Sequence, residues 1–472
     1  MKKYLFAALL FAVVMFAARA GLSTDPGTPE TEPPSHKKLT TDIDASIRKG
    51  IRYLEKSIHK NGHYGVEVPA GKNGKTQYIA DVGITGLAVL SILETPFARD
   101  EIEKEYFRKA VAYLLNNVRD SGAIVGEEGD RSTYKTAICL RVFILLNEKK
   151  YAEIIKNARD FLRKEQFDEK DKLPEDKDFF FGGWGYGGKF VRTTLPPSEF
   201  AIEGLRKSGL DADDPVFKRA VKFLARCQNL SETNDYDRAH SEIDQVNDGG
   251  ARHSPTTSKV ETRTTEGRIK LASYGSMTAA FIKSLLYCGV SKDDVRLRAA
   301  FRWMAKNYSL ENNPGLTKEN NKGKQGLFYY YQTLSKAFLL HGAHVIETPD
   351  GKPHNWAAEM SGKMLSLQRD DGSWINQFEA RWFEGNSSLV TAYSLLSLAN
   401  CRRDLEAQQA FVRNTDGEIE EREDRLVEIA IARALGELGR DEADREITQL
   451  GEEIAAIRQR LDKLKSTIRF EE

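Results

Sequence analysis

The chain has 472 residues, of which 40% are hydrophobic and 30% charged, and its 70 basic side chains balance its 70 acidic ones. A net charge of zero argues against nucleic-acid binding and against binding to anionic membranes, which both favour a strongly basic surface. The four cysteines lie far apart and form no CxxC pair, so neither a disulfide framework nor a zinc ribbon is expected.

Residues 1–20 have the pattern of a secretory signal peptide. Two lysines precede an apolar run over residues 4–18, and Ala18-Arg19-Ala20 supplies small residues at a cleavage site. The alternative is a membrane anchor, which needs about 20 apolar residues, whereas Arg19 ends this run early. We therefore expect an exported protein, periplasmic or secreted, with no membrane span in the mature chain. Residues 21–40 contain four prolines and few apolar residues, which predicts a disordered linker.

A short sequence motif, which we call the phrase, recurs within residues 41–401. It consists of a basic residue, a small residue, two of any type, an aromatic residue and an aliphatic one. The clearest copy is Lys49-Gly50-x-x-Tyr53-Leu54. Copies that keep their register but vary in spacing indicate stacked supersecondary units. After each phrase comes a more apolar helical stretch rich in Ala, Gly, Ser and Leu. These stretches are residues 82–93, 133–146, 198–210, 276–290, 329–341 and 389–401.

The two kinds of helix favour different layers. The phrase helices are amphipathic and heavily charged, which is typical of an outer layer, whereas the apolar helices favour an inner one. Six such pairs in alternation predict an all-α protein, an (α/α)6 toroid of six helical hairpins whose inner helices surround a central cavity. An open helical solenoid is the alternative.

The repeats also carry a family resemblance. Gln368-x-x-x-Gly372-x-Trp374 fits the tail of the QW motif of squalene and oxidosqualene cyclases, and Lys49-Gly50-x-x-Tyr53-Leu54 fits its head. The chain therefore resembles the prenyltransferase and squalene oxidase (squalene cyclase-like) repeat superfamily over residues 42–401. It is most similar to the exported members from planctomycete-type bacteria. The resemblance implies a terpenoid cyclase/protein prenyltransferase toroid with a cavity for a hydrophobic, isoprenoid-like ligand.

The catalytic motifs of that superfamily are not convincingly present. Asp211-Ala212-Asp213-Asp214 matches the D-x-D-D acid of the cyclases in letters, but Pro215 follows it, which favours helix capping. His341 and His344 share a helical spacing without a third ligand, and no Asp-rich diphosphate motif occurs. We predict no metal and no cofactor, and whether the protein is an enzyme stays open.

Some residues could still face a cavity. The weak catalytic candidates are Asp81, Glu199 and Asp248, and Glu384 also lies near the start of an inner helix. Aromatic rings that could line the cavity and stabilise cations are Tyr134, Tyr274, Tyr329, Tyr330 and Tyr331. The alternatives are core packing for the tyrosines and helix-start electrostatics for the acids.

Residues 402–472 form a helical extension of different composition. Apolar residues recur there at spacings of three and four, which is the a/d seam of a coiled coil. The seam consists of Ile447, Leu450, Ile454, Ile457, Leu461, Leu464 and Ile468. We expect it to join subunits, and a helix folded back on the toroid is the alternative.

Two functions follow from the sequence. The first is an exported terpenoid cyclase- or prenyltransferase-like protein that holds a hydrophobic small molecule in its cavity. The second is a non-catalytic binding or scaffold toroid that oligomerises through its coiled coil. A tightly bound hydrophobic molecule would favour an enzyme or a non-catalytic binding toroid, and a polar, water-filled channel would favour a scaffold.

Overall fold

The computed structural model describes residues 33–70, 75–169, 179–189, 192–317 and 319–470, and the expected signal peptide lies outside these ranges. Six inner helices carry most of the core. They are α3 (Val82–Leu93), α6 (Ser132–Leu146), α8 (Leu195–Lys207), α11 (Gly275–Tyr287), α13 (Leu327–His341) and the first part of α15 (Ser387–Leu435). Each begins within three residues of the predicted apolar stretch. In α3, every residue from Val82 to Ile92 is buried, so an all-apolar, small-residue sequence is required there.

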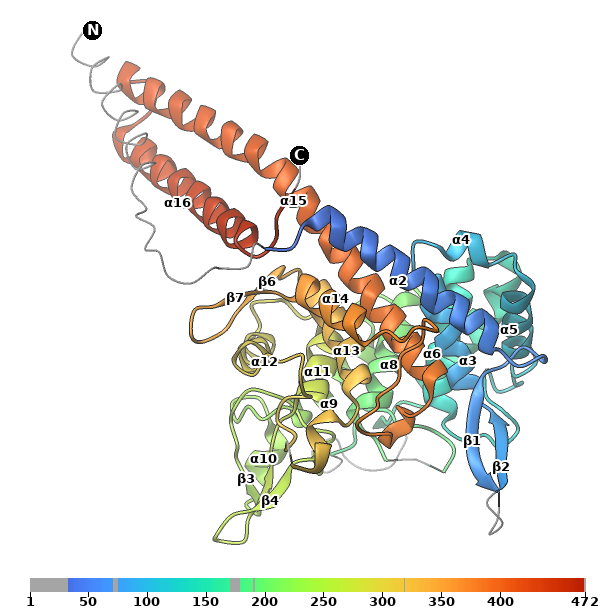
Figure 1. Cartoon of the computed structure of the whole chain (residues 1–472). Coiled ribbons are helices and arrows are strands. Elements are labelled where there is room, and N and C mark those ends of the chain that lie inside the picture. The colour runs from blue at the N-terminus through green and yellow to red at the C-terminus, as the bar shows by residue number, and fades with distance from the viewer. Residues whose placement is uncertain (1–32, 71–74, 170–178, 190–191, 318, 471–472) are drawn as a thin grey trace. The chain divides into compact units, whose positions relative to one another are not determined.

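Six outer helices alternate with the inner ones. They are α2 (His36–Ser57), α5 (Glu105–Leu115), α7 (Ala152–Lys164), α9 (Pro215–Cys227), α12 (Val295–Lys306) and α14 (Trp356–Leu367). Each of the last five contacts the inner helix that precedes it, and α2 contacts α15. In Figure 1, α2 accordingly lies along α15, although the two are far apart in the sequence.

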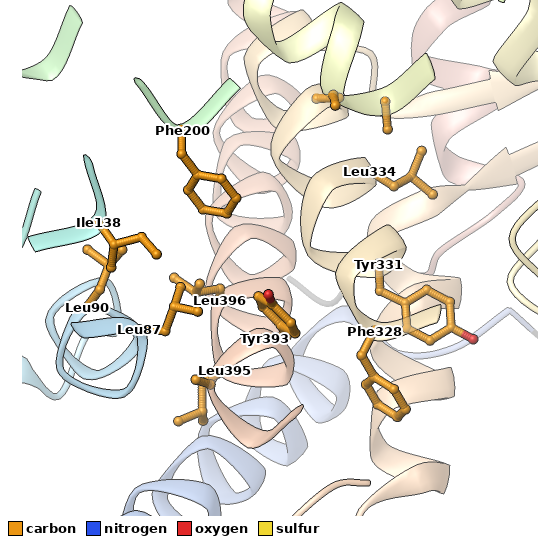
Figure 2. Packing of buried hydrophobic residues seen from close by; sticks show 14 of the residues in the cluster. Leu87, Leu90, Ile138, Phe200, Phe328, Tyr331, Leu334, Tyr393, Leu395 and Leu396 are labelled. Atoms are coloured by element: carbon orange, nitrogen blue, oxygen red, sulfur yellow. The ribbon is translucent and has the colours of Figure 1, made fainter. Parts of the chain in front are cut away.

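The inner helices form a closed ring. In order, α3 contacts α6, α6 contacts α8, α8 contacts α11, α11 contacts α13, α13 contacts α15, and α15 returns to α3. Figure 2 shows part of this packing, where Leu87 and Leu90 of α3 lie close to Ile138 of α6 and Leu396 of α15. A closed ring of six pairs confirms the predicted α/α toroid and rules out the open solenoid.

The QW-like residues close the ring. Gln368, at the end of α14, donates from Nε2 to the Ser46 carbonyl of α2 (3.0 Å). Gly372 has φ +90°, and a Cβ at this position would stand 2.5 Å from the Lys49 carbonyl oxygen. Trp374 is fully buried and donates from Nε1 to the Met364 carbonyl (2.8 Å). This segment is thus structural, because Gly372 and Trp374 hold the end of α14 against α2.

Small sheets and short helices interrupt the repeats. A hairpin pairs β1 (Gly65–Ala70) with β2 (Lys75–Ala80), and β3 (Ile243–Asp244), β5 (Ile269–Leu271) and β4 (Glu261–Arg263) form a sheet in that order. A second hairpin pairs β6 (Val345–Glu347) with β7 (Pro353–Asn355). The short helices are α4 (Ala98–Glu101), α10 (Asp235–Ala239), η1 (Lys149–Tyr151), η3 (Glu319–Lys324) and η4 (Arg381–Phe383). The sequence did not predict these strands, so the all-α prediction is correct for the ring and incomplete for its loops.

Two helices extend across predicted boundaries. Helix α2 begins at His36, inside the expected linker, because Ser35 caps it and Leu39 is buried. At the other end, α15 runs without a break through residue 401 to Leu435, and α16 (Arg440–Lys465) packs against it. The extension is therefore continuous with the sixth inner helix. None of the helices in the described ranges has the length and apolar character needed to cross a bilayer.

Candidate functional site

Charged side chains from all six inner helices meet inside the ring. We call them the ionic column: Glu94, Arg141, Glu199, Glu203, Lys283, Lys336 and Arg403. At its centre, Lys283 Nζ lies 2.9 Å from Glu199 Oε2 and 3.1 Å from Glu203 Oε2. All three of these side chains are fully buried. Burying a charge is costly unless it is paired, and Lys283, Glu199 and Glu203 are paired with one another here.

The column continues toward the C-terminal ends of the inner helices. Arg141 Nη2 of α6 lies 3.0 Å from Glu203 Oε1 of α8 and 2.9 Å from Glu94 Oε1, at the end of α3. Glu94 Oε2 lies 2.6 Å from Arg403 Nη1 of α15. Ion pairs thus link α11, α8, α6, α3 and α15 across the middle of the ring.

The charges in the column shift one another's titration. Burial opposes ionisation of Glu94, but Lys336, Arg141 and Arg403 hold its pKa at about 2. The pKa of Glu203 likewise lies below its usual range, because Arg141 and Lys283 outweigh the effect of burial. Lys336 differs, since burial lowers its pKa to about 8 despite the nearby carboxylates. The described residues supply it with no hydrogen bond or ion pair.

Four tyrosines lie near the N-terminal ends of the inner helices, and one of them, Tyr329, contacts the column. We call Tyr134, Tyr186, Tyr329 and Tyr393 the tyrosine mouth. Tyr329 donates its hydroxyl to Glu199 Oε1, and its ring lies 6.1 Å from that of Tyr393. The Tyr134 ring lies 5.8 Å from that of Tyr186. Burial raises the pKa of all four phenols, so they are neutral hydroxyls at physiological pH.

The structure does not bring the three acidic candidates together. Asp81 caps α3 by accepting from the Ile84 backbone N–H (2.8 Å), whereas Glu199 lies in the column. Asp248 accepts from Trp303 Nε1 (3.1 Å) on an outer helix. Glu384 is buried, which raises its pKa to about 7, and it accepts from two backbone N–H groups at the start of α13.

The predicted tyrosines also separate into two groups. Tyr134 and Tyr329 belong to the mouth. Tyr274 is 2% exposed and immediately precedes α11, whereas Tyr330 and Tyr331 donate their hydroxyls to the Ser309 and Leu310 carbonyls. Figure 2 shows Tyr331 directed away from Phe200 and Tyr393.

The residues of the motifs considered for catalysis make structural contacts. Asp214 caps α9, with Oδ1 2.9 Å from the Val216 nitrogen. His341 stacks on Phe301 (4.0 Å between ring centroids), while His344 Nδ1 lies 2.9 Å from Asp404 Oδ1. Within the described ranges, no cluster of three or more His, Cys, Asp or Glu could hold a metal ion.

Sequence reasoning found Glu199 but missed most of its partners. Arg141, Glu203, Lys283 and Lys336 each lie within an inner helix whose residues are mostly buried. A long charged residue at the middle of such a helix was the available signal, because lysine and arginine are almost never fully buried unless they are paired. Their partners could not be read from the sequence, because they come from helices more than 40 residues away.

No family model and no curated protein matches this sequence. Solved structures do resemble it. The type II terpene cyclase MstE from Scytonema is 15% identical, with 77% of this chain and 99% of that chain covered and a TM-score of 0.47. An α-1,6-mannanase from a Salegentibacter species is 13% identical (78% and 99% covered, TM-score 0.45). A family 76 glycoside hydrolase from a bovine Bacteroides thetaiotaomicron strain is 12% identical (77% and 78% covered, TM-score 0.44).

Proposed function

We propose that the protein is an exported, non-catalytic toroid that binds a carbohydrate at the tyrosine mouth. The observation that carries the proposal is a group of four tyrosines, one of which, Tyr329, donates its hydroxyl to Glu199 of the buried Glu199–Lys283 pair. Aromatic faces suit the apolar faces of sugar rings, and the phenols suit their hydroxyl groups. A few fixed polar groups among aromatic side chains are typical of small-molecule sites.

The ionic column argues against the isoprenoid ligand that the family resemblance implies. A polyene deep in the ring would lie against Glu199, Glu203 and Lys283, and would strip any remaining water from them without offering a hydrogen bond in return. The column is instead the polar axis expected of a binding or scaffold toroid. The acids near the mouth are also occupied: Glu199 by Lys283, and Glu384 by backbone N–H groups.

The test uses the mature chain, residues 21–472. We expect isothermal titration calorimetry to detect binding of at least one uncharged hexasaccharide from a panel of mannan, cellulose and xylan fragments. Tyr329→Phe, which removes the hydroxyl at the mouth, should weaken binding about tenfold, and Tyr78→Phe on the β1–β2 hairpin should not change it. Mass spectrometry should show each sugar unaltered. A stoichiometric isoprenoid in the organic extract, or a mass change of the sugar on incubation, would contradict the proposal.

A further inference from the structure

The loop between α14 and α15 presents three large aromatic side chains to solvent. Phe378 is 55% exposed, Trp382 40% and Phe383 46%. The other four tryptophans of the chain are at most 6% exposed. A cluster of exposed aromatic rings is unusual on a protein surface and often marks an interaction site.

The backbone of this loop is strained where the rings emerge. Trp382 (φ 58°, ψ 34°) and Phe383 (φ 66°) both have left-handed conformations, which side chains of this size rarely adopt. Buried side chains below the rings hold the conformation. Asn376 donates from Nδ2 to Glu384 Oε2 (2.7 Å), and its Oδ1 accepts from two backbone N–H groups of the loop. Strain that the surroundings impose in this way is typical of functional segments.

Two cations flank the exposed indole. Arg381 Cζ lies 5.3 Å and Lys259 Nζ 5.9 Å from the centroid of the Trp382 ring. Both side chains are exposed, and within the described ranges neither forms an ion pair with an acidic side chain. Burial and the charge of Arg381 together lower the pKa of Lys259. Like charges held together beside an aromatic ring are complementary to an anion.

The same loop borders the tyrosine mouth. Phe383 is followed directly by Glu384, which accepts from the backbone N–H of Tyr329 (2.9 Å). On the other side, the Phe383 ring lies 5.5 Å from Arg131 Cζ, and Arg131 immediately precedes α6, the helix that carries Tyr134. A ligand that spans several rings could therefore contact the loop and the mouth together.

We propose that Trp382 and Phe383, with Lys259 and Arg381, form a binding site for an acidic carbohydrate at the rim of the toroid. We call these four residues the aromatic lip. The ring faces of the sugar stack on the two aromatic side chains, and its carboxylate or sulfate group lies between the two cations. This inference rests on the proposed function and names its ligand class.

Charge and shape together favour an acidic sugar over an acidic peptide. The lip and the mouth both contain aromatic rings, and several rings along one surface suit the repeated rings of an oligosaccharide. The tyrosine hydroxyls next to them match its many hydroxyl groups. An acidic peptide would satisfy Lys259 and Arg381 but would leave the ring faces and the phenols without matching groups.

The experiment compares two ligands that share one sugar backbone and differ in charge. Galacturonic acid hexamer and its fully methyl-esterified form are titrated into the mature chain by calorimetry at low salt. We expect the acid to bind at least tenfold more tightly, and the difference to shrink in 0.5 M salt because screening weakens exposed ion pairs. The fluorescence of Trp382 should shift to the blue on binding, since the other tryptophans are already buried.

Substitutions identify the contributing side chains. Trp382→Ala should weaken binding of both hexamers about tenfold, whereas Lys259→Gln and Arg381→Gln should each weaken only the acid, by about threefold to tenfold. Matched controls are Tyr78→Ala, an aromatic residue with 43% exposure, and Lys38→Gln on α2. Because all of these positions are exposed, unfolding temperatures should stay within about 2 °C of wild type.

The outcomes separate the two proposals. Equal affinity for the acid and the ester, with no effect of the lip substitutions, would overturn the proposed acidic-sugar site. It would leave the proposal of a carbohydrate-binding toroid unaffected. Both proposals would be overturned if the protein bound none of the sugars tested, which are the two galacturonate hexamers, a chondroitin sulfate hexamer and the uncharged hexasaccharides. A hexaglutamate peptide that binds as tightly as the acid hexamer would overturn the choice of a carbohydrate.

Discussion

At the scale of single residues, the ionic column contains two buried lysines in opposite situations. Lys283 has two carboxylate partners at 2.9 and 3.1 Å, whereas Lys336 is 6% exposed and has no such partner among the described residues. Removing one member of a buried ion pair strands the other charge, which typically costs about 3–5 kcal/mol. Lys336 differs, because burial lowers its pKa in spite of its attraction to Glu94 and Glu203, so that removing it relieves a net cost at neutral pH.

We therefore expect Lys283→Met to destabilise the fold by about 3–5 kcal/mol and Lys336→Met to stabilise it at pH 7 by about 1–3 kcal/mol. The pH dependence follows from the pKa of Lys336, about 8 when folded and 10.5 for an ordinary lysine. Between these values the unfolded chain binds more protons, so wild-type stability rises with pH and the advantage of Lys336→Met fades. Urea unfolding at pH 7 and pH 10 measures both effects. Destabilisation by Lys336→Met at pH 7 would show that the attraction of Lys336 to Glu94 and Glu203 outweighs the cost of its burial.

Single residues were also where prediction from sequence reached its limit. A carboxylate at the start of an inner helix could be foreseen at Asp81, Glu199 and Glu384, but three different outcomes followed: a helix cap, an ion pair and a clamp on the loop after α14. The sequence identifies residues able to ionise. Which of them meet depends on contacts between helices that lie far apart in the chain.

At the scale of elements, the inner helices could be predicted because their composition is dictated by burial on all sides. Gly86 of α3 illustrates this, since a Cβ there would stand 3.0 Å from Ile138 of α6. The loops were less predictable. The turn at Gly372 could be predicted from the Gly-x-Trp pattern. The strained turn at Trp382 and Phe383 could not, because neither residue is a glycine.

The closing contact of the ring can be tested at Gly372. We expect Gly372→Ala to destabilise the protein by about 2–4 kcal/mol, through left-handed strain and the 2.5 Å approach to the Lys49 carbonyl. Gly209 is the matched control, because it has φ +92° but nothing within 4 Å of an added Cβ. Gly209→Ala should therefore cost only the strain, about 1 kcal/mol. If chemical denaturation showed the same loss of unfolding free energy for the two variants, α2 would be able to shift away from the added methyl group without loss of stability.

At the scale of the whole molecule, the toroid followed from six repeats in register, but the arrangement of the extension did not. A heptad pattern indicates that a helix packs against an apolar partner, but it does not identify which helix that partner is. Here Ile454, Leu461 and Leu464 are buried, and α16 packs against α15 of the same chain. Facing residues of α15, Ile419 and Ile429, are buried as well. Self-association through the seam stays a prediction, and it now requires α16 to leave its own α15.

The turn between the two helices decides whether that exchange can occur. Gly436 ends α15 with φ +76°, and α16 starts at Arg440, so four residues reverse the chain. Deleting residues 436–439 would join α15 and α16 into one helix that cannot fold back on itself. The uncovered seam would then pair with a second chain, because exchange of an identical element between protomers preserves its contacts. We expect the deletion variant to sediment as a dimer, and a variant with a longer Gly-Ser turn to sediment as the wild type does. A deletion variant that keeps its helical content and stays monomeric would mean that the seam contributes too little free energy to join subunits.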